Sequence, residues 1–313
     1  PDLREALGSV AGDAAARIEA LIRGTSANPL QGLVSGSLDL DKIEYLKRDA
    51  RFCGVPYGDV DVDRLLHALT LLTDPVTGQL EVGVHEKGVA ALESLLFAKY
   101  QMFRNVYWHH AVRAATVLYK RVVSDALRHR LVTGDELVGA TDEGLMHLLE
   151  TRSREHAVTG SGSVATGVRA LRSRRLPKRA AEIAAADVDE ARVGDWVVTD
   201  TALKRDVENR LAEQLDLKGG AVFLDYPEKS MMFGLHLLVR RRSGEVLRLG
   251  PEGRAGLIGL PEIAAELYRS ARVLRLFTLE GRREVSVPSL VALAQQSGDS
   301  VLAALRGGAT LLA

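Results

Sequence analysis

The chain has 313 residues, of which 46% are hydrophobic, and its 41 basic side chains balance its 41 acidic ones. This length allows a large buried core and predicts two domains, while the zero net charge gives no overall attraction to nucleic acid or lipid. No apolar run approaches the roughly 18 residues of a membrane span, and no signal peptide opens the chain. The single Cys53 excludes an internal disulfide and suits a reducing compartment. We therefore predict a cytoplasmic protein, with neither membrane nor nucleic acid as an expected partner.

Residues 2–23 carry apolar side chains at helical spacing, which predicts an amphipathic helix. These positions are Leu3, Leu7, Val10, Ala14, Ile18 and Leu21. Gly24 is expected to end the helix, and a connector rich in Ser, Asn, Pro and Gly leads to a second helix. Asp39 lies where the N-cap of that second helix is expected.

The second predicted helix separates polar from apolar side chains. At about 100° per residue, Asp41, Tyr45 and Arg48 fall on one face, and Ile43 and Leu46 fall on the opposite side. Asp41 lies in the first turn, near the positive end of the helix dipole. By composition alone, such a face is typical of an amphipathic helix whose charged side lies in water.

A longer pattern favours a functional site on this face. Residues 35–49 read SGSLDLDKIEYLKRD, and residues 54–58 read GVPYG. This run resembles, almost position by position, a segment of the HD-superfamily phosphohydrolases, in particular the deoxynucleoside triphosphate triphosphohydrolases. The resemblance implies a mainly α fold, an HD-domain-like helical bundle, and a metal site made by two His and two Asp side chains. Asp41 matches the last aspartate of that site.

The resemblance also implies roles for the neighbours of Asp41 in binding a nucleotide. Lys42 would neutralise phosphate oxygens, Tyr45 would pack close to C2′ of the sugar, and Asp49 would accept a hydrogen bond from a 3′-hydroxyl. The cofactor would be a divalent metal ion (Mn, Fe, Co, Ni, Zn or Mg), since mixed His and Asp ligation fits transition metals better than calcium. No general acid or base is assigned.

Three of the four metal ligands of this family have no counterpart in the chain. The first histidine is His67, which follows Asp41, and the sequence contains no His-Asp dipeptide. The chain begins with Pro1 rather than Met, as a processed product or a part of a longer chain would. We therefore expect the missing ligands in a segment that precedes this chain. The alternative is that the site has been lost.

The next elements are predicted as a helix over residues 61–73, a turn between short strands over 74–82, and a long helix over 85–130. Lys99 falls within the leucine-rich stripe of the long helix, where a lysine either extends to solvent or meets an anion. Residues 95–110, LLFAKYQMFRNVYWHH, again resemble the HD triphosphohydrolases. That resemblance implies that Lys99, Tyr107 and His109 line the nucleotide pocket. Without it, Tyr107 and His109 are equally typical of ordinary packing.

Lysine at position 99 replaces the arginine usual in the family, which keeps the positive charge but loses bidentate phosphate geometry. Further along, residues 159–163 predict a loop, and a basic cluster follows around Pro177. The cluster consists of Arg169, Arg172, Arg174, Arg175, Lys178 and Arg179. It fits either a solvated helix end or a site for a regulatory nucleotide or another partner.

From about residue 185 short strands alternate with helices and turns, including a helix over 261–270 and a strand over 273–278. We predict a helical HD-type domain over residues 1–184 and a smaller α+β domain over 185–313, with an antiparallel sheet and helices on one face. Nothing in the second domain looks catalytic, so we expect a role in assembly or regulation. The resemblance implies a homo-oligomer.

The resemblance implies a metal-dependent phosphohydrolase that converts a dNTP to a deoxynucleoside and tripolyphosphate. Two alternatives stay open. The protein is a non-catalytic nucleotide-binding or scaffold protein if the histidines are lost, or a phosphohydrolase acting on other nucleotide phosphate esters.

Overall fold

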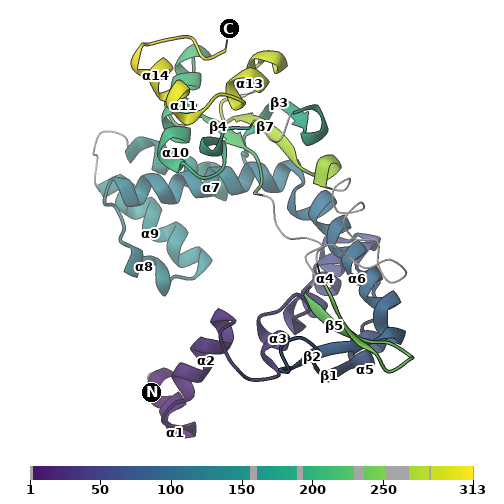
Figure 1. Cartoon of the computed structure of the whole chain (residues 1–313). Helices are drawn as coiled ribbons and strands as arrows, with labels where there is room; N and C mark the ends of the chain where they lie inside the picture. The colour runs from purple at the N-terminus through teal and green to yellow at the C-terminus, as the bar shows by residue number, and fades with distance from the viewer. Residues whose placement is uncertain are drawn as a thin grey trace. The chain divides into compact units, whose positions relative to one another are not determined.

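The computed structural model describes residues 3–155, 161–188, 193–228, 236–250, 268–281 and 283–312. Most of these residues are helical, and the strands form two small sheets (Figure 1). This confirms the predicted mainly α fold with a smaller α+β part. Among the described helices, none combines the length and the apolar composition that crossing a bilayer requires.

The helices are α1 (Leu3–Val10), α2 (Ala14–Arg23), α3 (Gln31–Val34), α4 (Leu40–Cys53), α5 (Val62–Ala68), α6 (Val89–Met102), α7 (His110–Arg128), α8 (Gly134–Val138), α9 (Asp142–Glu155), α10 (Ser161–Arg172), α11 (Thr201–Gln214), α13 (Val287–Ala294) and α14 (Gly298–Arg306). The strands are β1 (Leu69–Thr73), β2 (Leu80–His85), β3 (Lys178–Ala184), β4 (Val222–Asp225), β5 (Leu237–Arg240), β6 (Val246–Leu249) and β7 (Val273–Thr278). A π-helical segment, Phe103–Tyr107, lies between α6 and α7.

The chain forms two compact units, each assembled from two separate stretches. Unit 1 is Pro1–Val106 with Ser230–Leu267, and unit 2 is Tyr107–Lys229 with Tyr268–Ala313. These units do not divide at residue 184, because β5 and β6 come late in the chain but belong to the sheet that β1 and β2 begin. The division into folding domains at residues 1–184 and 185–313 stays a prediction.

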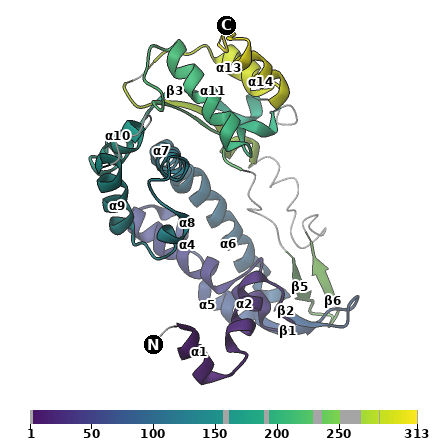
Figure 2. The same cartoon turned by 90° about the vertical axis from the view of Figure 1, so that its left-hand side faces the viewer.

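The sheet of unit 1 has the order β1-β2-β5-β6, and Figure 2 shows its strands side by side. β1 and β2 form an antiparallel hairpin, whereas β2 and β5 pair in parallel with Gly83 opposite Leu238. A side chain at Gly83 would come within 2.5 Å of the Leu238 carbonyl oxygen, so the glycine permits the close approach of β5. The sheet therefore joins residues about 155 positions apart in the sequence.

Three predicted helices of this region are interrupted. The helix over 2–23 breaks between Val10 and Ala14, and the helix over 61–73 ends at Ala68, where the chain enters β1. The helix over 85–130 begins only at Val89 and is divided by the π-helical segment. Helical periodicity could not predict β1, because this strand forms through its tertiary pairing with β2.

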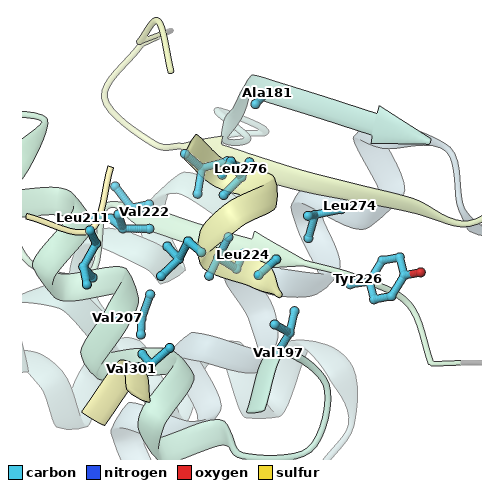
Figure 3. Close-up of a cluster of buried hydrophobic side chains, with 14 of the residues drawn as sticks. Ala181, Val197, Val207, Leu211, Val222, Leu224, Tyr226, Leu274, Leu276 and Val301 are labelled. Carbon is cyan, nitrogen blue, oxygen red and sulfur yellow. The ribbon is translucent and has the colours of Figure 1, made fainter. Parts of the chain in front are cut away.

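The sheet of unit 2 has the order β3-β7-β4 and is antiparallel throughout, as predicted. One face packs Leu224 and Leu276 against Val207 of α11 and Val301 of α14 (Figure 3). The other face packs Phe223 and Phe277 against α7, α9 and α10. The sheet therefore has helices on both faces, rather than on one face as predicted.

Two predicted elements fall wholly or partly outside the described residues. Residues 159 and 160 of the predicted loop over 159–163 are not described, and residues 161–163 belong to α10 rather than to a loop. Of the predicted helix over 261–270, residues 261–267 lie outside the described residues. The rest, residues 268–270, is helical, and the helix extends to residue 271.

Candidate functional site

The candidate site of unit 1 is built on α4. The carboxylate of Asp39 accepts a hydrogen bond from the backbone N–H of Lys42 at 2.8 Å, which confirms Asp39 as the N-cap. Gly54 ends the helix in a left-handed conformation with φ of 67°. Ile43 and Leu46 are buried, so the predicted apolar face does pack against the interior. The opposite face is left to carry the polar side chains.

On that polar face, carboxylates gather around the half-buried Tyr45. The pKa of the Tyr45 phenol is raised, first by burial and then by the negative charges of Asp39, Asp41 and Asp49. Asp41 is exposed, and Asp49 is partly buried beside Arg48, whose Nε lies 3.7 Å from a carboxylate oxygen of Asp49. The phenol therefore stays protonated over the physiological range and can donate a hydrogen bond.

Lys42 is held in place by two acceptors. Its ammonium Nζ donates to the backbone carbonyl of Gly36 at 2.7 Å and to Oδ2 of Asp39 at 2.5 Å. The Asp39 side chain is largely buried and that of Lys42 is partly buried. A phosphate that reached Lys42 would share this ammonium with the carboxylate of Asp39.

Lys99 reaches the same place from α6, which packs against α4. Its side chain is half-buried, and its pKa is lowered to about 8, first by burial and then by the positive charge of Lys42, while Asp39 opposes the shift. Because the charges of Lys42 and Asp39 both act on Lys99, Lys42 and Lys99 are here called the lysine pair. Two cations beside one carboxylate suit an anionic ligand.

Tyr107 and His109 belong to unit 2. Tyr107 ends the π-helical segment, and His109 is the exposed N-cap of α7, where its Nδ1 accepts a hydrogen bond from the N–H of Ala111 at 3.4 Å. The rings of His109 and His110 lie 4.2 Å apart. Asp41, Lys42, Tyr45, Asp49 and Lys99 thus all lie in unit 1, and a shared pocket that includes Tyr107 and His109 stays a prediction.

The described residues do not complete a metal site. Within them, no three His, Cys, Asp or Glu side chains are grouped so that they could hold a metal ion. Asp41 can supply one carboxylate, and its role as a metal ligand stays a prediction.

A cavity of unit 1 that the sequence did not indicate adjoins the lysine pair. It measures about 640 Å³ and is lined by residues that include Gly36, Ser37, Gln79, His236 and Arg248. The same Gly36 whose carbonyl holds Lys42 forms part of its wall. Its residues come from distant parts of the sequence, so no local pattern could have revealed it.

Unit 2 gathers part of the predicted basic cluster around a cavity of about 710 Å³. Arg174, Lys178 and Arg179 line it together with His110 and Glu182. The pKa of His110 is lowered, first by burial and then by the charge of Arg179, so the imidazole is mainly neutral at pH 7. The predicted cluster is only partly retained, because Arg172 pairs with Glu143.

Comparison with known proteins places the chain in a family. The family model described as the HD associated region matches residues 60–252, more than half of the chain. The chain belongs to this family. Membership in the HD associated region family confirms the HD part of the resemblance inferred from residues 35–58 and 95–110.

The relatives of this HD associated region are longer proteins. The uncharacterized protein MJ1154 of Methanocaldococcus jannaschii is 34% identical over 130 residues, 41% of this chain and 28% of the relative. The uncharacterized protein YwfO of Bacillus subtilis is 33% identical over 94 residues, 30% of this chain and 20% of the relative. The matched segments therefore span less than a third of these relatives.

Among solved structures, a phosphohydrolase (BT4208) of Bacteroides thetaiotaomicron resembles the chain with a TM-score of 0.58 and 16% identity. The match covers 89% of this chain and 70% of that chain. At this identity the likeness shows a shared fold.

Proposed function

We propose that the chain is the nucleotide-binding part of an HD-type, metal-dependent phosphohydrolase. The observation that carries the proposal is the lysine pair, in which the partly buried Lys42 binds the carboxylate of Asp39 and the charges of both act on the half-buried Lys99 of α6. Such a cluster favours phosphate, because charge-assisted hydrogen bonds to lysine strengthen away from water. Membership in the HD associated region family supports the choice of this class.

The finer proposal concerns the substrate, a dNTP that would be cleaved to a deoxynucleoside and tripolyphosphate. Lys42 and Lys99 would bind phosphate oxygens, and Tyr45 and Asp49 would contact the sugar. Tyr107 and His109 would complete the pocket. These roles rest on the resemblance of residues 35–49 and 95–110 to the triphosphohydrolases.

A divalent metal would polarise a phosphate oxygen or activate a water molecule when bound. Asp41 is proposed as one of its ligands, and the others would lie outside the described residues. Asp41→Ala in the natural full-length protein should remove bound metal and abolish hydrolysis without unfolding the chain, since Asp41 is exposed. Elemental analysis and tripolyphosphate release from dNTPs, with and without chelator, measure both effects. Undiminished metal content and turnover would remove Asp41 from the site.

The lysine pair is tested by binding. Lys99→Met should weaken dNTP binding about 10- to 100-fold, the usual effect of losing a charge-assisted hydrogen bond. Lys47→Met is the matched control, because Lys47 is an exposed lysine on the same helix as Lys42. Equal affinities for the two variants would contradict the proposal.

The same assays separate the two alternatives. Binding of dNTPs without release of product would identify a nucleotide-binding or scaffold protein. Faster hydrolysis of nucleoside monophosphates or other phosphate esters would identify a phosphohydrolase of different specificity.

The cavity of unit 2 favours a second candidate function, the binding of a regulatory nucleotide in a cytoplasmic homo-oligomer. Arg174, Lys178 and Arg179 line this cavity, whereas the carboxylate of Glu182 is shared between Arg179 and Arg275, so basic side chains outnumber acidic ones there. Lys178→Ala together with Arg174→Ala should then abolish any change in oligomeric state caused by nucleotide. Light scattering after size-exclusion chromatography measures that change, and an unaltered response would contradict this candidate.

A further inference from the structure

The end of α10, the start of β3 and the turn between them are strongly basic. Residues 169–179 read RALRSRRLPKR, here called the basic turn, and they include no acidic side chain. The basic side chains are all exposed, namely Arg169, Arg172, Arg174, Arg175, Lys178 and Arg179. The zero net charge of the chain gives no overall attraction to polyanions, but a local cluster acts on ligands within a Debye length of about 10 Å.

Carboxylates neutralise two of these cations. Arg172 pairs with Glu143, and Arg179 pairs with Glu182, where a guanidinium nitrogen and a carboxylate oxygen lie 2.9 Å apart. Within the part of the chain that the structure describes, the remaining cations form no ion pair, namely Arg169, Arg174, Arg175 and Lys178. The basic turn therefore carries four positive charges without a counter-ion.

The end of α10 connects this charge to the cavity of unit 2. The N–H of Arg175 donates to the carbonyl of Ala170 at 2.9 Å, and Arg174 adopts a left-handed conformation with φ of 52°. Arg174 lines the cavity of about 710 Å³ together with Lys178 of β3. Arg169 and Arg175 are not among the residues that line it. The unpaired charge thus extends beyond the cavity along the basic turn.

We propose that the basic turn binds the phosphate backbone of a single-stranded nucleic acid. Four unpaired cations spread along one segment suit a row of phosphates better than a single anion. Three of the four are arginines, whose guanidinium groups bind phosphate in bidentate geometry. A flexible single strand can follow a turn of this size, whereas a duplex with a persistence length of about 50 nm cannot. The inference does not depend on the function proposed for unit 1.

The basic turn offers charge rather than surfaces on which bases could stack. Among the described residues that line the cavity there is no Phe, Tyr or Trp. Binding should therefore depend on phosphate contacts, show no sequence preference and weaken as salt is added.

Two matched variants separate the basic turn from the rest of the protein. Arg174→Gly removes one cation and places glycine at a left-handed position, which glycine favours, so the fold is retained. Arg130→Gly is the control, since Arg130 is also exposed and has φ of 56° in the turn that follows α7. This turn lies at the opposite end of α7 from His110, which lines the cavity with Arg174. Circular dichroism should show that both variants are at least as stable as the wild type.

Fluorescence anisotropy measures the binding of a labelled oligonucleotide of about 20 nucleotides to the natural full-length protein. Each phosphate contact of a single strand contributes about −0.7 to the slope of the logarithm of the association constant against that of salt concentration. The four unpaired cations therefore predict a slope of about −3. Arg174→Gly should give about −2 and bind about 5-fold more weakly in 0.1 M salt, whereas Arg130→Gly should match the wild type.

Several results would overturn the inference. One is equal affinity of the two variants for the oligonucleotide, or a salt slope that Arg174→Gly leaves unchanged. Another is tighter binding of a duplex of the same length, or binding of anionic lipid vesicles by a protein that does not bind the oligonucleotide. Displacement of the oligonucleotide by an equal concentration of a single dNTP would instead assign the basic turn to a regulatory nucleotide.

Discussion

Asp74 shows how one carboxylate can hold a turn and a distant strand together. Its side chain is 1% exposed. Oδ1 accepts a hydrogen bond from the N–H of Val76 at 2.7 Å, and Oδ2 accepts one from Nε of Arg248 at 3.0 Å. The pKa of Asp74 is lowered, first by the backbone hydrogen bond from Val76 and then by the one from the Arg248 side chain. The hairpin of β1 and β2 is thereby tied to β6.

The lowered pKa of Asp74 makes the stability of the folded protein depend on pH. Because the pKa of Asp74 is lower in the folded protein than in the unfolded chain, its contribution is present above the ordinary value of 3.8 and is lost as pH falls below it. Asp74→Asn should lower the melting temperature by roughly 2–4 °C at pH 7, and by less at pH 3. Circular dichroism from pH 3 to 7 measures this, with exposed Asp187→Asn as control. A difference that stays constant with pH would contradict the prediction.

Replacing the buried Asp225 should lower the stability of the protein more than replacing Asp74. It is 1% exposed, accepts a hydrogen bond from Nε of Arg113 at 2.9 Å and lies 3.9 Å from a guanidinium nitrogen of Arg275. Asp225→Asn should cost about 3 kcal/mol of unfolding free energy, since it leaves the largely buried Arg113 without its counter-ion, whereas Arg275 keeps its pair with Glu182. Glu213→Gln, which breaks an exposed pair with Arg210, should cost less than about 1 kcal/mol. Denaturant unfolding compares the two, and equal losses would contradict this reasoning.

At the scale of elements, the turn Pro56–Gly58 positions α4. A Cβ at Gly58 would overlap that of Ala50 and lie 2.9 Å from the carbonyl oxygen of Leu46. The glycine that ends the GVPYG pattern is therefore required by close packing against the buried face of α4.

Gly58→Ala should destabilise the protein by about 1–3 kcal/mol, because neither the backbone of Leu46 nor the short Ala50 can move aside. Gly139→Ala is the control, since nothing lies within 4 Å of its added Cβ. Thermal unfolding measures the loss, and the dNTP affinity should fall with it if the turn also positions Lys42. A Gly58→Ala protein as stable as the control would contradict this packing argument.

Local signals were sufficient where an element is decided by its own residues. The cap at Asp39 and the spacing of Ile43 and Leu46 predicted the start and the buried face of α4. Periodicity could not predict β1, because β2 decides it from across a turn. The sequence likewise placed Lys99 on an apolar stripe, but its proximity to Lys42 depends on the packing of α6 against α4, which spacing does not encode.

At the scale of the whole molecule, the composition of the units predicts how fragments behave. A fragment of residues 1–184 would lack β5 and β6 of one sheet, and β4 and β7 of the other. It would leave β2 and β3 with unpaired edges and would remove Phe223 and Phe277 from the core beneath α7. We therefore expect the fragment to aggregate or to unfold without cooperativity.

Limited proteolysis and the dispersion of amide NMR signals test this expectation against the full chain. A fragment with a dispersed spectrum and a single sharp unfolding transition would instead support two sequential domains divided at residue 184.

The parallel pairing of β2 with β5 also has a consequence during synthesis on the ribosome. Gly83 emerges long before its partner Leu238, so the edge of β2 stays unpaired while most of the remaining chain is translated. At about 5–20 residues per second, the roughly 155 intervening residues take on the order of ten seconds. During that interval a nascent chain presents the same open strand to its neighbours on a polysome, and a chaperone that shields it would decide how much protein reaches its final form.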